Sequence, residues 1–168
     1  MSDNICCRPV QFTEKCEAAI KLDGGRMTNT RRLVIKLLDS SKVPLSANEI
    51  FDRLDKQSSA QLKSKKDFSK APSTLIDKVT VYRILERFTE LGLLHRVGPN
   101  GKFIKCVHNH EGKHSMHLLC RCNNCGVTAE LALTPQLNIN LNNLLKSLHF
   151  VTTGSPFQID GICEKCIK

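Results

Sequence analysis

Aromatic residues are scarce in this sequence of 168 residues, which holds no tryptophan, one tyrosine and seven phenylalanines. So few large rings are ordinary for small helical domains but thin for the core of a large enzyme. Hydrophobic residues still make up 40% of the chain, which is enough for packed cores and excludes disorder throughout. The length allows one large domain or two small ones.

Long apolar runs are also missing. No stretch approaches the roughly 20 apolar residues that span a membrane, and the N-terminal MSDNICCRPVQFTEK lacks the apolar stretch of a signal peptide. We therefore expect a cytoplasmic protein without a membrane partner. Because cytosolic thiols stay reduced, the nine cysteines indicate metal binding rather than disulfides.

The sequence lacks the motifs of zinc enzymes. Zinc deaminases need H-x-E together with P-C-x-x-C, and neither occurs here. The H-E-x-x-H of metalloproteases is missing too. We expect no catalytic residue, no enzymatic activity and no small-molecule substrate.

Acidic residues are the minority charge, 16 against 25 lysines and arginines, so the formal net charge is +9. A cationic surplus raises the local potential and favours polyanions such as nucleic acid. The alternative is a basic protein whose lysines are simply solvated, and charge alone does not separate the two.

Helical periodicity dominates the first half of the chain. Residues 13–23 predict a short amphipathic helix, and residues 25–41 a second, capped by Thr28 or Asn29. A capping box, S-x-x-E, begins at Ser46 and predicts the start of a third helix.

The next segment, residues 55–76, is polar and rich in serine and lysine, and we expect a mobile loop. Asp77 can cap the helix that follows, and Gly92 is a natural stop for it. The apolar positions of this helix have helical spacing and predict a buried stripe of Val81, Ile84, Leu85, Phe88 and Leu91.

A hairpin follows this helix. LLHRV and KFIKCV, joined by GPNG, predict two strands within residues 93–107. Short helices followed by a hairpin are typical of a winged helix-turn-helix, in which the last helix enters the major groove of DNA. We assign this DNA-binding domain to residues 1–107.

The composition changes beyond residue 107, where histidines and cysteines accumulate. VTAELAL predicts a strand, residues 134–150 a helix with leucines on one side, and FQIDGI a final strand. We assign residues 108–168 to a small α/β domain. The expected fold class is therefore α+β, a winged helix-turn-helix followed by a small α/β domain.

Two C-x-x-C pairs bracket this second domain. Zinc prefers four soft ligands in a tetrahedron, and a C-x-x-C turn supplies two thiolates along one edge. The pairs predict a closed structural zinc site that staples the domain, although redox dithiols or unrelated buried cysteines have the same spacing. Cys120 has poor spacing for this site, and we expect it in a strand. The predicted ligands are Cys122, Cys125, Cys163 and Cys166.

Several blocks resemble the ferric uptake regulator family, in order along residues 14–168. They are RMTNTRR, VTVYRILERFTELGLL, and CNNCG with a terminal DGICEKC. The combination of TVYR, C-x-x-C-G and G-x-C-x-x-C is specific. The resemblance implies a homodimer that binds double-stranded operator DNA, with an N-terminal winged helix and a C-terminal α/β dimerisation domain.

Within the family, a second metal site resembles that of zinc uptake regulators. Their ligands correspond here to His95, Cys106, His114 and Glu130, with eleven residues from His95 to Cys106 and eight more to His114. The stretch from His114 to Cys122 is about one residue longer than in the zinc uptake regulator pattern. The choice of the third ligand therefore stays open between His114, His108, His110 and His117.

The resemblance implies a zinc-responsive repressor of zinc uptake genes, with one structural and one regulatory zinc per subunit. A thiolate with two imidazoles and a carboxylate suits tetrahedral zinc, whereas iron sensors use more oxygen and nitrogen donors. Iron-type members also have a histidine before the capping box, where this chain has VPLSANEI. The alternatives are a ferrous-iron regulator and a zinc-stapled interaction module without DNA binding. Each predicted ligand also has an alternative interpretation. His95 could be a surface histidine, Cys106 a buried thiol and Glu130 a solvated carboxylate.

The resemblance also indicates residues that contact DNA. Tyr82 and Arg83 match the YR of the family's TVYR, and Arg83 is suited to guanine O6 and N7. The alternative for any one arginine is a solvated helix face. The candidates for phosphate contacts are Thr80, Arg87, Arg26, Arg31 and Arg32.

Overall fold

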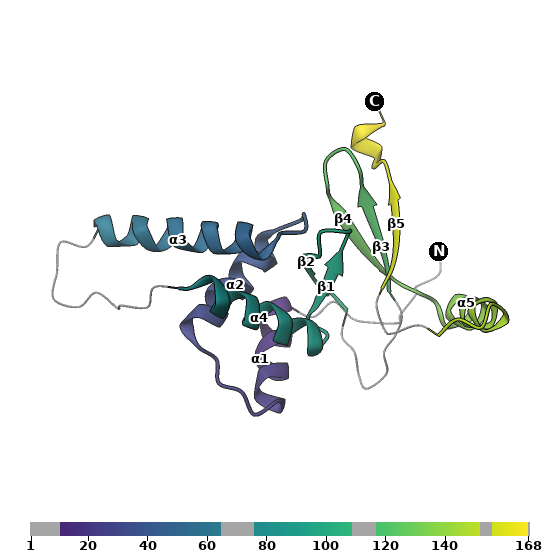
Figure 1. The fold of residues 1–168 in the computed structure, drawn as a ribbon, viewed down its shortest axis with the longest axis horizontal. Helices are drawn as coiled ribbons and strands as arrows, with labels where there is room; N and C mark the ends of the chain where they lie inside the picture. The colour runs from purple at the N-terminus through teal and green to yellow at the C-terminus, as the bar shows by residue number, and fades with distance from the viewer. Residues whose placement is uncertain (1–10, 65–75, 109–116, 152–155, 168) are drawn as a thin grey trace.

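The computed structural model describes residues 11–64, 76–108, 117–151 and 156–167 and has the expected mixed α+β architecture (Figure 1). Four helices and a two-stranded hairpin precede a three-stranded sheet and a further helix. The elements are α1 (Phe12–Leu22), α2 (Asn29–Ser40), α3 (Ala47–Ser64), α4 (Lys78–Glu90), β1 (Leu94–Val97), β2 (Lys102–Lys105), β3 (His117–Cys122), β4 (Thr128–Ala132), α5 (Pro135–Ser147), β5 (Phe157–Gly161) and a 3₁₀ turn (Glu164–Cys166).

The predicted helix starts are confirmed by their side-chain caps. The hydroxyl of Thr28 accepts the N–H of Arg31 at 3.3 Å in α2, and the carboxylate of Asp77 accepts the N–H of Thr80 at 2.7 Å in α4. At α3, Glu49 accepts the N–H of Ser46 at 2.7 Å while Ser46 accepts that of Glu49 at 3.2 Å. Each cap satisfies donors that the helix leaves free.

A single apolar core joins α1 to α4 and the hairpin. Val81, Ile84, Leu85 and Phe88 of α4 are buried in it, as the sequence predicts. The hairpin of β1 and β2 is called the wing. Leu45, before α3, exchanges two backbone hydrogen bonds with Phe103 of β2, and this isolated bridge anchors the wing to the helices. This core fixes the wing relative to α4.

The predicted loop at residues 55–76 is wrong in its first part, because α3 continues to Ser64. Serine, lysine and glutamine make a segment polar without breaking a helix, and the sequence has no glycine or proline between α3's start and Pro72. Residues 65–75 lie outside the described part of the chain. Within the described ranges, no helix combines the length and apolar character needed to cross a bilayer.

The sheet has the strand order β4–β3–β5, with β3 antiparallel to β4 and parallel to β5. The two outer strands are predicted from the sequence. Of the central strand β3, the sequence analysis places only Cys120 in a strand. Leu119 of β3 lies opposite both Glu130 of β4 and Gln158 of β5. The central strand therefore lines up residues that are far apart in the sequence.

The wing lies against this sheet. Val97 and Ile104 of the hairpin form a small buried cluster with Leu119 of β3. At the wing turn, the N–H of Gly98 donates to the side chain of Gln158 at 2.9 Å. Gly98 has a positive φ of 70°, a backbone conformation that side chains rarely adopt, so this turn favours glycine.

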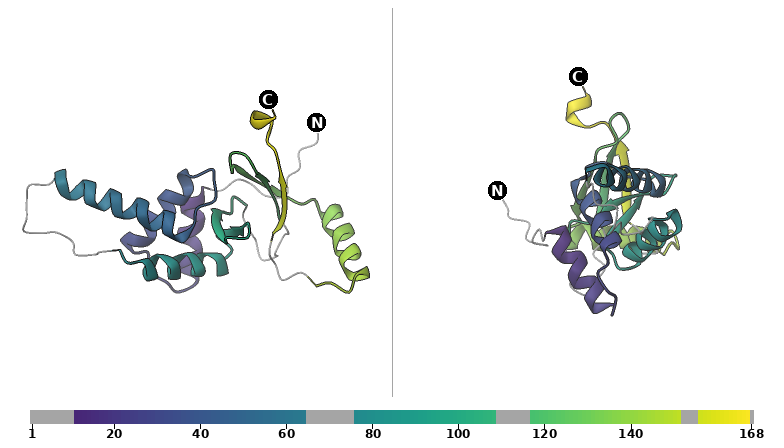
Figure 2. Two further views of the ribbon diagram at one scale, coloured as in Figure 1. Left: turned by 45° about the horizontal axis from the view of Figure 1, so that its top comes forward. Right: turned by 90° about the vertical axis from the view of Figure 1, so that its left-hand side faces the viewer.

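Helix α5 stands away from the rest of the chain (Figures 1 and 2). Thr134 caps it and Pro135 occupies its first turn, but none of its side chains is buried. Leu144 and Leu148 are 63% and 71% exposed, and Phe150 just beyond the helix is 65% exposed. The apolar side of this amphipathic helix is therefore not covered by any part of the chain that the structure describes.

Candidate metal centres and nucleic-acid interface

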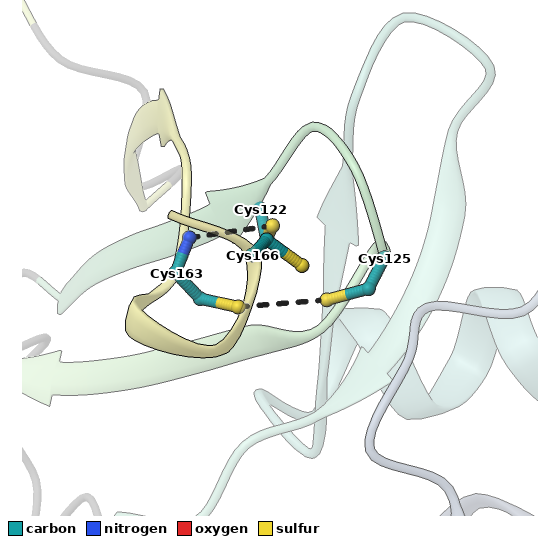
Figure 3. A group of neighbouring side chains, drawn as sticks. All are labelled: Cys122, Cys125, Cys163 and Cys166. Carbon is teal, nitrogen blue, oxygen red and sulfur yellow. Dashed lines mark hydrogen bonds between the residues drawn. The ribbon is translucent and has the colours of Figure 1, made fainter. Parts of the chain in front are cut away.

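The four predicted cysteines meet at one end of the sheet (Figure 3). Cys122 ends β3 and Cys125 lies in the turn after it, whereas Cys163 precedes the 3₁₀ turn after β5 and Cys166 ends it. Their sulfur atoms all lie within 4.8 Å of one another, and the sulfurs of Cys125 and Cys163 are 3.7 Å apart. The parallel pairing of β3 with β5 brings the two pairs together.

This four-cysteine cluster fits zinc. A tetrahedron with zinc–sulfur bonds of about 2.3 Å has sulfur–sulfur edges of about 3.8 Å. Backbone N–H donors at Cys125 and Cys163 lower the pKa of Cys122 to about 6. Hydrogen bonds to Cys163 and Cys125 raise the pKa of Cys166 to about 12. The protein alone therefore favours the thiolate of Cys122 and disfavours that of Cys166, which a bound cation would stabilise.

A second cluster lies between the wing and the sheet. His95 comes from β1, Cys106 follows β2, His117 begins β3 and Glu130 lies on β4. Glu130 Oε1 is 2.8 Å from His95 Nε2, 2.5 Å from His117 Nδ1 and 3.4 Å from Cys106 Sγ. The two ring nitrogens are 3.3 Å apart, and His117 Nδ1 is 3.9 Å from the sulfur.

Burial and hydrogen bonding set the charges of this mixed cluster. Burial alone would raise the pKa of Glu130, but hydrogen bonds from His117 and His95 outweigh it and hold that pKa well below its usual range. Burial likewise opposes the charged form of His117, yet its hydrogen bonds with Cys106 and Glu130 raise its pKa. A carboxylate and an imidazolium thus stabilise each other in a nearly solvent-free site.

The donor types of the mixed cluster also fit zinc. A sulfur, two imidazole nitrogens and a carboxylate oxygen are four ligands that zinc accepts in a tetrahedron. The nitrogen–nitrogen, sulfur–oxygen and sulfur–nitrogen separations of 3.3, 3.4 and 3.9 Å are close to the edges of such a tetrahedron, about 3.3–3.6 Å. The shorter nitrogen–oxygen contacts are hydrogen bonds between Glu130 and the two histidines.

Three of the four predicted regulatory ligands therefore lie together, and His117 lies with them. His114 is outside the described residues. The sequence leaves His117 as one of four choices, and only its position at the start of β3, opposite β4, separates it from the others. His108 packs beside it, with ring centroids 4.9 Å apart, and burial lowers its pKa.

The candidate DNA-contacting residues mostly share one face. Four of them, with Thr28 and Ile84, line an open hollow between the start of α2 and α4: Arg26, Arg31, Thr80 and Arg83. Tyr82 is 49% exposed beside it, and Arg32 is exposed on α2. Arg87 differs, because its guanidinium pairs with Asp23 and, at 2.7 Å, with Glu90.

A family model matches more than half of the sequence. The model of the ferric uptake regulator family matches residues 66–159. The chain belongs to the ferric uptake regulator family. As a member it is a metal-responsive transcription regulator rather than an enzyme.

Curated relatives agree with this membership. The ferric uptake regulation protein of Bordetella parapertussis is 31% identical over 99 residues, which cover 58% of this chain and 68% of that protein. The peroxide-responsive repressor PerR of Staphylococcus aureus is 26% identical over 157 residues, 91% of this chain and 90% of the repressor. The family's members differ in the signal they sense, so membership alone does not give the metal.

Solved structures share the fold. A zinc uptake regulator complexed with zinc and DNA superposes with a TM-score of 0.70 at 20% identity, covering 94% of this chain and 96% of that one. The holo form of a second zinc uptake regulator, XcZur, gives a TM-score of 0.67 at 24% identity, covering 93% and 96%. At these identities the similarity establishes the architecture, and the sensed metal rests on the side chains.

Proposed function

We propose that this chain is a zinc-responsive transcriptional repressor that binds operator DNA as a homodimer and controls zinc uptake genes. The observation that carries the proposal is the mixed cluster of His95, Cys106, His117 and Glu130, which joins the wing to the sheet. His114, predicted from the spacing, is the alternative third ligand.

The donor set favours zinc over ferrous iron. Cys106 contributes a soft thiolate, and the cluster offers one carboxylate rather than several. Ferrous iron and manganese favour larger shells with more oxygen and nitrogen donors. When bound, zinc would supply a cation that draws all four donors to one point.

The protein's own residues would convert binding into a fixed geometry. His95 and Cys106 belong to the wing, whereas His117 and Glu130 belong to the sheet. Holding the four side chains together fixes the wing, and through the shared core α4, relative to the sheet. Helix α4 is proposed to enter the DNA groove and is called the reader helix. Two such subunits then present their reader helices at one fixed spacing, which is what paired half-sites require.

The hollow lined by Arg26, Arg31, Thr80 and Arg83 supports DNA as the ligand. Arg83 is exposed on α4 and is proposed to read guanine, with Tyr82 beside it. We assign phosphate contacts to Thr80 and to the remaining arginines, Arg26, Arg31, Arg32 and Arg87, and expect the weakest from Arg87, which two acidic side chains already hold.

The exposed apolar side of α5 supports a second copy of the chain as its partner. Leu144, Leu148 and Phe150 are each more than 60% exposed. Clustered apolar side chains on a surface mark a site that another protein covers. We accordingly assign residues 1–107 to DNA binding and residues 108–168 to dimerisation. We further propose one structural zinc at the four-cysteine cluster, one regulatory zinc at the mixed cluster, and a cytoplasmic location.

The proposal is tested by operator binding during a zinc titration of the homodimer, in which the four-cysteine cluster is already filled. Wild-type protein should gain DNA affinity with zinc, and Cys106→Ser should lose that gain. Cys120→Ser is the matched control, because Cys120 is exposed on β3 and belongs to neither cluster.

The alternatives give different results in the same experiment. A ferrous-iron regulator would gain affinity with ferrous iron at concentrations where zinc has no effect. An interaction module would bind no DNA with either metal. Equal zinc-dependent binding by Cys106→Ser and wild type would show that the mixed cluster is not the switch.

A further inference from the structure

Lys15 of α1 reaches across the molecule to three backbone carbonyls. Its ammonium nitrogen lies 2.6 Å from the oxygen of His108, 3.2 Å from that of Cys106 and 3.4 Å from that of Gly92. The side chain is half-buried. An ammonium has three N–H donors, so these carbonyls use its whole hydrogen-bonding capacity.

The three carbonyls belong to two different parts of the regulator. Gly92 lies two residues beyond the end of α4, where the helix dipole favours a cation. Cys106 is a member of the mixed cluster, and His108 lies two residues beyond it, against His117. Lys15 thus holds the end of the reader helix and the cluster's sulfur-bearing segment at one point.

Backbone hydrogen bonds complete this connection. The N–H of Cys106 donates to Leu93 at 2.8 Å, and the N–H of Leu93 donates to Phe88 of α4 at 2.9 Å. A displacement of Cys106 is therefore opposed by Lys15 on its carbonyl side and by Leu93 on its amide side. Hydrogen bonds from a charged donor are stronger than those between neutral groups, so Lys15 adds substantially to the backbone link.

We infer that Lys15 is a positioning residue that transmits the state of the mixed cluster to the reader helix α4. The inference rests on the proposed function, since it needs zinc-dependent DNA binding. Without the ammonium, the four donors can still gather around zinc, but only the backbone link through Leu93 still connects Cys106 to α4. Zinc binding and DNA binding then become less coupled.

The test compares Lys15→Met, Lys15→Arg and Lys21→Met in the full-length homodimer with its four-cysteine cluster filled. Methionine keeps the length of the side chain and removes its charge, while arginine keeps the charge. Lys21 is exposed on the same helix and is the control. For each protein, operator affinity is measured with and without zinc, and cobalt is bound in place of zinc to report the ligand geometry spectroscopically.

Lys15→Met should reduce the zinc-dependent gain in operator affinity by tenfold or more, while cobalt still shows a tetrahedral thiolate site. Lys15→Arg should restore most of the gain, and Lys21→Met should match wild type. An undiminished gain in a folded Lys15→Met protein would overturn the inference and leave the proposed function standing. If wild type itself shows no zinc-dependent gain, the proposed function fails first.

Discussion

The two candidate metal-binding clusters of this chain differ in composition, burial and connectivity. The four-cysteine cluster uses one ligand type, lies at an exposed end of the sheet and connects only β3 with the segment after β5. The mixed cluster uses three ligand types, is nearly solvent-free and connects the wing to β3 and β4. The first therefore closes one unit on itself, whereas the second spans two.

The contacts among the donors differ as well. In the mixed cluster Glu130 hydrogen-bonds to both histidines, so the wing and the sheet share polar contacts at this site. In the four-cysteine cluster the donors are sulfur atoms alone, with Cys125 and Cys163 3.7 Å apart.

The largest effect is expected from breaking the four-cysteine cluster. Cys163→Ser should lose one tightly bound zinc per subunit and lower the melting temperature by roughly 10 °C or more, since the metal's binding energy goes into folding. Metal analysis and calorimetry measure both effects. Cys120→Ser should change neither, and an unaltered melting point in Cys163→Ser would show that this cluster is not structural.

The next largest effect is expected from the mixed cluster. Glu130→Gln keeps the shape of the side chain and removes the charge that the histidines face. A coupling of about 3 kcal/mol corresponds to a roughly 150-fold zinc-dependent gain in operator affinity, and the variant should keep less than about tenfold of it. Fluorescence anisotropy measures the gain, with Glu17→Gln on the surface of α1 as the control. If Glu130→Gln keeps one zinc per subunit and the wild-type melting temperature, the role of the mixed cluster is distinct from that of the four-cysteine cluster.

Removing the DNA contact should separate sensing from reading. Arg83→Ala should cost about 1–3 kcal/mol of discrimination between operator and mutated operator, while both metal stoichiometries stay at the wild-type level. Arg87→Ala should have a smaller effect, because Asp23 and Glu90 already hold that guanidinium. Competition binding with altered operators measures the difference, and a uniform loss across all sequences would count against base reading by Arg83.

The smallest expected effect is a pH dependence that reverses between metal states. With the mixed cluster metal-free, the raised pKa of His117 stabilises the folded protein below its ordinary value of 6.5, and this stabilisation is lost as pH rises through the raised pKa. With zinc bound, protons compete for the same nitrogen, so zinc affinity falls as pH falls.

Denaturation of protein with only the four-cysteine cluster filled, between pH 6 and 8, measures the first trend. The depressed pKa of Glu130 keeps that carboxylate charged throughout this window, so it adds no slope. The free energy of unfolding of wild type should differ between pH 6 and pH 8, and His117→Gln should remove this difference. A slope unchanged by the substitution would assign the pH dependence to another group.

Local features of the fold could be predicted from the sequence, and features set by tertiary packing could not. The caps at Thr28 and Asp77 and the box at Ser46 depend on neighbours three residues away, so the pattern suffices. The end of α3 could not be predicted, because a polar segment without helix breakers suits a loop and a helix equally. The position of β3 depends on its pairing with β4 and β5, which join segments distant in sequence.

The same distinction holds for the candidate sites. Two C-x-x-C pairs predict their own cluster, because each turn fixes two sulfurs and only the pairing of β3 with β5 is needed. The third ligand of the mixed cluster depends on the register of β3, which spacing along the chain does not give. Lys15 carries no sequence signal at all, since its partners are backbone carbonyls more than 75 residues away.

The most direct test follows operator affinity while zinc is added stepwise to metal-free protein, with bound zinc per subunit counted at each step. We predict that the first equivalent fills the four cysteines and raises the melting temperature with little change in affinity, and that the second produces the rise in affinity. A full rise in operator affinity with the first equivalent, and none with the second, would contradict the division of labour between the two clusters.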